Sequence, residues 1–198
     1  MLKRMKHLMR WGLGVAVILT ASTRVKAEVL VEEFSRGGVS LNWQIVNDSV
    51  MGGISNSNMD WVSDEVVRFS GRLAMENNGG FASVRSSGRM PEMAEAKAMV
   101  IRVKGDGRTY QLRLRTSTGW RVPDYSAEFT TKLGQWQTLV LPLRDFEAGW
   151  RGRAIRDAPP VDPREIRSIG ILLGDKKPGG FALEIDWIKA STAGKTKA

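Results

Sequence analysis

Short apolar runs separated by turn-forming residues recur from residue 29 onward, and this pattern constrains the fold more than any other feature of the chain. Pro, Gly, Asn and Asp fall between the runs, where they favour turns. No stretch carries the repeat of a long amphipathic helix. The sequence therefore predicts an all-β antiparallel sandwich, with a closed barrel as the alternative. We expect its strands at 29–31, 41–46, 65–69, 72–75, 81–85, 97–104, 109–115, 135–141, 165–173 and 181–188.

Two local predictions concern how these strands join. The turn sequence at 105–108 contains Gly105, Asp106 and Gly107, so we expect 97–104 and 109–115 to form a hairpin. Ser70 and Gly71 separate 65–69 from 72–75, and here we expect a bulge or a bend.

Residues 1–27 have the pattern of a secretory signal peptide. A basic segment at 1–10 precedes an apolar run at 11–21 that is short for a bilayer span, and Val25 and Ala27 are small residues at cleavage positions. We expect cleavage after Ala27 and a periplasmic or secreted protein without stable membrane insertion; retention of the segment as an anchor is the alternative. The remainder is then one domain at 28–190 and a flexible tail at 191–198.

The predicted signal peptide carries much of the excess positive charge. Six of the 30 Lys and Arg residues, and none of the 21 Asp and Glu residues, precede Glu28, so cleavage lowers the net charge from +9 to +3. The high isoelectric point is then largely a property of the targeting segment. It gives no reason to expect nucleic-acid binding.

Cleavage also removes His7, the only histidine, and the chain has no cysteine. A Ser-His-Asp triad, a cysteine nucleophile, and metal or haem ligation by His or Cys are thereby excluded. We expect no cofactor, no metal and no enzymatic activity. A Ca²⁺ site built from Asp and backbone carbonyls stays open, although no spaced ligand motif is present.

Two glycine-rich loops are candidate binding sites. Asx residues and glycines in such loops satisfy nearby backbone groups or allow close approach, so a purely structural role is the alternative. In the first loop we expect an apolar anchor and a polar rim, with Met51 as an adaptable contact. The candidate residues are Asn47, Asp48, Ser49, Met51, Gly52, Gly53 and Ser55 in the first loop, and Asn78, Gly79 and Gly80 in the second.

Alternation along the predicted strands places basic residues on outer faces. The candidates are Arg85, Arg102, Arg113 and Arg115, and we expect Glu184 and Asp186 to share the face of the last three. This predicts a cationic recognition surface for an acidic protein or an anionic glycan, with a cross-strand ladder of ion pairs as the alternative. Glu184 and Asp186 could also serve as the carboxylate pair of a hydrolase, but the sequence has no cleft signature.

Several segments together resemble the complex I intermediate-associated protein 30 family. They cover most of the chain after residue 28, in the order of the family: Trp43, 47–55, 69–71, 78–85, 105–110, 136–143, 145–146, 151–153, 169–170 and 181–188.

The resemblance implies a galactose-binding-domain-like jelly-roll β-sandwich that acts by binding. The mitochondrial members of the family are assembly factors for respiratory complex I, whereas the signal peptide predicted here directs the chain to another compartment. We expect a protein partner in the cell envelope and a role in assembly or as a chaperone. A carbohydrate-binding module that holds a glycan through exposed residues such as Trp61, Trp120 or Trp150 is the alternative.

Overall fold

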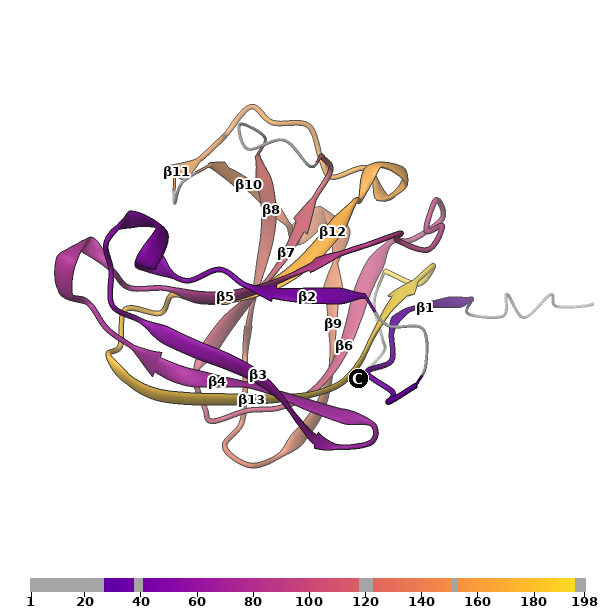
Figure 1. Cartoon of the computed structure of the whole chain (residues 1–198). Helices are drawn as coiled ribbons and strands as arrows, with labels where there is room; N and C mark the ends of the chain where they lie inside the picture. The colour runs from indigo at the N-terminus through magenta and orange to yellow at the C-terminus, as the bar shows by residue number, and fades with distance from the viewer. Residues whose placement is uncertain (1–26, 38–40, 118–122, 151–152, 195–198) are drawn as a thin grey trace, which may run out of the picture.

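The computed structural model describes residues 27–37, 41–117, 123–150 and 153–194, which fold into two antiparallel sheets (Figure 1). Sheet A has the strand order β3 (Asn56–Ser63), β4 (Val66–Leu73), β13 (Gly179–Ser191), β6 (Ala98–Lys104), β9 (Trp136–Pro142), and β1 (Glu28–Glu32) also pairs with β13. Sheet B has the order β11 (Arg153–Ala154), β10 (Glu147–Trp150), β8 (Asp124–Thr130), β7 (Thr109–Arg115), β12 (Ser168–Leu173), β5 (Ala82–Ser87), β2 (Asn42–Ile45). Short 3₁₀ turns lie at η1 (Asp48–Met51), η2 (Glu76–Asn78), η3 (Leu143–Asp145) and η4 (Pro163–Glu165).

The core lies between the two sheets and is built from alternate residues of their strands. Sheet B contributes Tyr110, Leu112 and Leu114 from β7, which are fully buried. Sheet A contributes residues such as Leu183 and Ile185 from β13, also fully buried. Removal of these apolar side chains from water is the main stabilising contribution to such a sandwich. The predicted all-β antiparallel sandwich is confirmed.

The predicted hairpin of 97–104 with 109–115 is wrong. β6 pairs with β13 and β9 in sheet A, whereas β7 pairs with β12 and β8 in sheet B, so the link at 105–108 crosses from one sheet to the other. Both strands bury apolar side chains, among them Ile101 and Leu112, and they contribute these to the shared core from opposite sides. The residues at 105–108 do form a turn, but this turn connects a strand of sheet A to a strand of sheet B.

The predicted bulge at Ser70 and Gly71 is also wrong, because β4 passes through both residues without interruption. Gly71 instead allows close approach of the edge strand: a Cβ there would lie 2.1 Å from the carbonyl oxygen of Asn56. The sequence prediction also missed β3, which is largely polar, and β8, which buries Tyr125, Ala127 and Phe129 in alternation.

The predicted signal peptide lies almost entirely outside the described residues. Cleavage and localisation therefore stay predictions. Within the described ranges, the structure contains no helix of the length and apolar character needed to span a membrane.

Candidate binding surfaces

Asp48 is fully buried and joins the two glycine-rich loops. Its Oδ2 accepts hydrogen bonds from the Ser55 hydroxyl at 2.5 Å and from the amides of Gly80 at 2.7 Å and Phe81 at 3.3 Å. Its Oδ1 accepts the Ser55 amide at 3.0 Å. Burial opposes ionisation of this carboxyl, but the hydrogen bonds outweigh burial and lower the pKa of Asp48.

Asn47 connects the first loop to both sheets. Its Oδ1 accepts the hydroxyl of Ser57 on β3 at 2.9 Å and the amide of Ser83 on β5 at 3.3 Å. Gly53 lies against the neighbouring carboxylate, since a Cβ there would lie 2.4 Å from Cγ of Asp48. The buried residues of this loop thus have the structural contacts that the loop-capping alternative requires.

The remaining residues of the first loop point outward, and the expected arrangement of an apolar anchor beneath a polar rim is wrong. Val50, Met51 and Ile54 are 70%, 59% and 55% exposed, whereas Asp48 and Ser55 are buried. The side chains of Asp48 and Ser55 turn inward because the amides of Ser55 and Gly80 have the Asp48 carboxylate as their acceptor there. We call Val50, Met51 and Ile54 the apolar loop surface.

The second glycine-rich loop lies beside the first at one end of the sandwich (Figure 1). Asn78 is exposed and has a left-handed backbone, with φ of 58°. Met75 precedes this loop, is itself exposed, and lies close to Gly80. Exposed Ser49 and the left-handed Gly52, with φ of 91°, complete the first loop.

Three of the four predicted arginines gather on the outer face of sheet B. Gly170 on β12 pairs with Arg85 of β5 on one side and with Arg113 of β7 on the other. Asp124 on β8 contacts Arg115, with 2.6 Å between Oδ1 and Nε, and Arg113, with 3.4 Å between Oδ2 and Nη1. Burial, followed by repulsion from Arg115, lowers the pKa of Arg85. We call Arg85, Arg113, Arg115 and Asp124 the arginine cluster.

Arg102 lies apart from the arginine cluster, so the predicted common face of Arg102, Arg113 and Arg115 is wrong. It projects from β6 in sheet A, where its Nη1 lies 3.2 Å from Oδ2 of Asp186 and its guanidinium lies 5.1 Å from the ring centre of Trp136. The reason is the same as for the hairpin: β6 and β7 belong to different sheets.

Glu184 and Asp186 accordingly do not share a face with the arginine cluster. Glu184 lies 2.7 Å from Arg68 Nη2 and 2.5 Å from Lys104 Nζ. Burial opposes ionisation, but bonds from Lys104 and Arg68 outweigh it and lower the pKa of Glu184. The alternative of a cross-strand ladder of ion pairs is thus found on sheet A, where it engages both carboxylates considered for a hydrolase.

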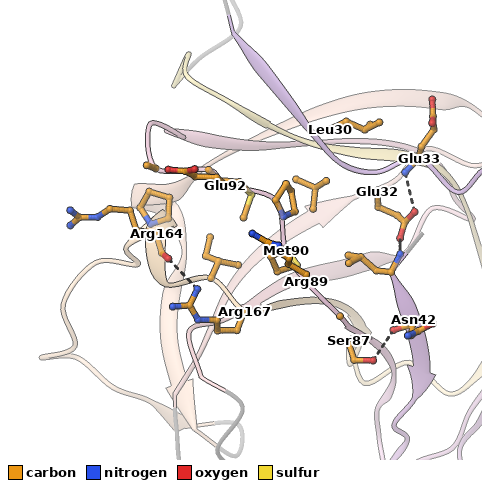
Figure 2. A pocket seen from close by; sticks show the side chains of 18 residues that line it. Leu30, Glu32, Glu33, Asn42, Ser87, Arg89, Met90, Glu92, Arg164 and Arg167 are labelled. Carbon is orange, nitrogen blue, oxygen red and sulfur yellow. Dashed lines mark hydrogen bonds between the residues drawn. The ribbon is translucent and has the colours of Figure 1, made fainter. Parts of the chain in front are cut away.

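A pocket of about 980 Å³ lies between β1, the segment 87–94 and η4 (Figure 2). Its wall includes Glu32, whose carboxylate accepts the Leu41 amide at 2.8 Å and the Trp43 indole N–H at 3.0 Å. Both apolar and charged side chains line it, among them Leu30, Leu41, Met90, Met93, Ile166, Glu33, Arg89, Glu92, Arg164 and Arg167. This pocket has no signal in the sequence, because its residues come from segments far apart in the chain and share no motif.

The tryptophans considered for glycan binding do not lie on one strand or in one sheet. Trp61 on β3 of sheet A and Trp150 on β10 of sheet B are partly exposed, and Trp120 lies outside the described residues.

The part of the chain that the structure describes has no group of three or more His, Cys, Asp or Glu side chains placed to hold a metal ion.

The architecture is that of a galactose-binding-like jelly roll, a fold found in carbohydrate-binding modules. The Family 11 module of a cellulosomal cellulase of Clostridium thermocellum is similar with a TM-score of 0.62, over 87% of this chain and 97% of the module, at 16% identity. A Family 11 module from Clostridium thermocellum in complex with a β-1,3-1,4-mixed-linked tetrasaccharide gives a TM-score of 0.59, over 82% and 94% of the two chains, at 17% identity. At these identities the likeness shows the fold alone.

The sequence assigns a family within this fold. The model of the Complex I intermediate-associated protein 30 family matches residues 33–185, and the chain belongs to that family. The mitochondrial Complex I intermediate-associated protein 30 of Neurospora crassa is 23% identical over 188 residues, covering 75% of this chain and 68% of that protein. The protein of the same name in Mus musculus is 34% identical over 106 residues, covering 51% of this chain but only 32% of the mouse protein.

Proposed function

We propose that this protein is a non-catalytic binding domain that contacts a partner protein through the apolar loop surface and acts in assembly within the cell envelope. The observation that carries the proposal is the exposure of Val50, Met51 and Ile54 on a loop whose backbone is fixed by buried Asp48. Burial of these side chains against a partner removes apolar area from water.

The fixed loop strengthens this argument. Ordering a mobile loop on binding costs free energy, and the hydrogen bonds of Asp48 to Ser55 and Gly80 establish the order before the partner arrives. Met51 adds a flexible, polarisable side chain that adapts to the shape of a partner. The expected occupant is therefore an apolar patch or segment of another protein.

Family membership supports a binding role in assembly. The Neurospora and mouse relatives are named as intermediate-associated proteins of complex I, and we extend association with a partner protein, without its identity, to this chain. The envelope location rests on the predicted signal peptide.

A photo-crosslinking residue placed at Met51 tests the proposal in envelope fractions. We expect a discrete crosslinked partner from position 51 that disappears when V50S and I54S are added. The matched control is the same crosslinker at Leu133, which is 75% exposed on a separate turn and should not capture that partner. Equal capture from both positions, or crosslinks only to a second copy of the chain, would overturn the proposal.

A carbohydrate-binding module is the second candidate, because solved modules of that class share the jelly-roll fold. Binding of a neutral mixed-linked glucan by the protein, unchanged by the V50S and I54S substitutions, would favour this candidate. Turnover of any substrate, abolished by substitution of a single carboxylate, would contradict a non-catalytic role.

A further inference from the structure

We infer that the outer face of sheet B holds a binding site for one carboxylate of an acidic saccharide, formed by Arg85 and Arg113 on either side of Gly170. This site lies on β5, β12 and β7, and its evidence is independent of the apolar loop surface. The inference therefore goes beyond the proposed contact with a protein partner.

The strand register creates the site. Five residues align across the face in the order Gln44, Arg85, Gly170, Arg113 and Ser126, from β2 to β8. Gly170 contributes no side chain between the two arginines, and a Cβ there would lie 2.8 Å from the carbonyl oxygen of Val84, so the close approach of β12 and β5 requires glycine. A small hollow at this position is lined by residues that include Ser83, Arg85, Arg113, Asp124 and Gly170.

The hollow has more cationic than anionic groups. Asp124 is the one carboxylate that lines it, and it lies within ion-pair distance of both Arg113 and Arg115. Asp124 also attracts Arg85, but its ion pairs are with Arg113 and Arg115. The Nε of Arg113 is buried without a hydrogen-bond acceptor among the described residues. A bound anion would neutralise Arg85 and supply an acceptor at the same place.

The shape of the ligand group follows from the guanidinium groups. A planar arginine fork bonds a carboxylate through two parallel N–H···O contacts. Arg85 and Arg113 both line the hollow, whose volume of about 10 Å³ admits one oxygen atom, so a carboxylate would place one oxygen in it and lie across its mouth. Glu128 and Glu147 lie on the same outer face, on β8 and β10, and their charge disfavours a dense polyanion.

The surroundings favour a sugar over an acidic peptide. The outer positions nearest the arginines include Gln44, Gln111 and Ser126, which are neutral groups that can exchange hydrogen bonds with hydroxyls. A peptide ligand would also bring apolar side chains, for which the five aligned residues offer no apolar partner; beside them, Leu172 on β12 is apolar and partly exposed. A uronic acid residue within an otherwise neutral glycan combines one carboxylate with many hydroxyls.

Calorimetric titration tests the inference with three probes of matched length: an oligosaccharide containing glucuronic acid, its neutral glucose counterpart and a glutamate-containing peptide. We expect the acidic oligosaccharide to bind most tightly, and R85Q and R113Q each to weaken it at least about tenfold, as loss of a charged hydrogen bond implies. R102Q is the matched control, because Arg102 is a partly exposed arginine on sheet A with its own carboxylate partner. It should leave the affinity unchanged.

Thermal unfolding of each variant separates loss of binding from loss of fold. The inference is overturned if the folded wild-type protein binds none of the probes, binds the neutral oligosaccharide equally well or prefers the peptide. It is also overturned if R102Q weakens binding as much as R85Q does. The V50S and I54S substitutions should not change saccharide affinity, and R85Q should not change partner crosslinking from position 51, so each proposal can fail without the other.

Discussion

The amide of Gly80 donates a 2.7 Å hydrogen bond to the carboxylate of Asp48, 32 residues earlier in the chain. This contact joins the loop after β2 to the loop after β4. Because the same carboxylate also accepts the amide and the hydroxyl of Ser55, a single buried side chain holds both loops in place. The exposed residues between Asp48 and Ser55 depend on it for their position.

Substitution of Asp48 by Asn should destabilise the protein. The amide has one oxygen in place of two and brings donors to a site where Ser55, Gly80 and Phe81 already donate. We expect a loss of about 2–3 kcal/mol in the free energy of unfolding, as for a buried charged acceptor left poorly matched. Denaturant unfolding measures it, with D64N, at an exposed carboxylate, as the control. Equal stability of D48N and D64N would contradict a structural role for Asp48.

The lowered pKa of Asp48 predicts a pH dependence with a definite sign. The folded protein holds this carboxyl in its ionised form below the ordinary pKa of about 4, so the unfolded chain takes up a proton first as the pH falls. The stabilisation from Asp48 is thus full at neutral pH and is lost in acid, as the pH falls through the folded-state pKa. The stability difference between wild type and D48N should shrink over that range. A constant difference down to acid unfolding would refute the assignment.

Two adjacent glycines should respond to alanine for different reasons. Gly53→Ala would place a Cβ against the carboxylate of Asp48, within 2.4 Å of its Cγ, and we expect it to cost about 1–3 kcal/mol through overpacking. Gly52→Ala meets open space but must adopt φ of 91°, which costs about 1 kcal/mol. Chemical denaturation of both variants should show the larger loss for G53A. The reverse order would mean that Asp48 can move aside at little cost.

The sequence predicts much of the fold because alternation reports which face of a strand is buried. Tyr110, Leu112 and Leu114 marked β7 correctly, and Tyr125, Ala127 and Phe129 carry the same signal for β8, which could have been recognised. The alternation of apolar and polar residues does not show which other strand pairs with a given strand. The turn at 105–108 therefore predicts a hairpin, although it carries the chain from one sheet to the other.

The candidate sites were predictable only in part for a related reason. The residue types at 47–55 predict two alternatives, a binding site or a loop held by its own hydrogen bonds. They do not predict that the amide of Gly80 bonds Asp48, because tertiary structure brings those two groups together. Likewise, Arg85 and Arg113 become neighbours only because β12 lies between their strands and presents Gly170. The register that aligns these three residues has no local signature in the sequence.

Two Arg–Asp pairs with similar geometry should differ in their effect on stability because they differ in burial. Arg108 reaches Asp175 through Nε at 3.0 Å and Nη2 at 2.6 Å, and the two side chains are only 12% and 7% exposed. Asp175→Asn would leave the Arg108 guanidinium beside a neutral amide in a desolvated place. We expect a loss of about 3 kcal/mol in the free energy of unfolding, as for a buried pair that loses one partner.

The exposed counterpart of this pair provides the control. Arg164 bonds Asp162 through Nε at 3.0 Å and Nη2 at 2.6 Å, but its side chain is 71% exposed. Solvent screening and side-chain entropy cancel most of such an attraction, so Asp162→Asn should leave thermal unfolding nearly unchanged.

High salt should likewise have little effect on the stabilisation that Asp175 contributes, because water scarcely reaches this carboxylate. If D175N and D162N unfold at the same temperature as wild type, the link between Arg108 and Asp175 does not stabilise the crossing between the sheets. A large loss of stability in D162N but not in D175N would show that burial does not decide which of the two pairs stabilises the protein.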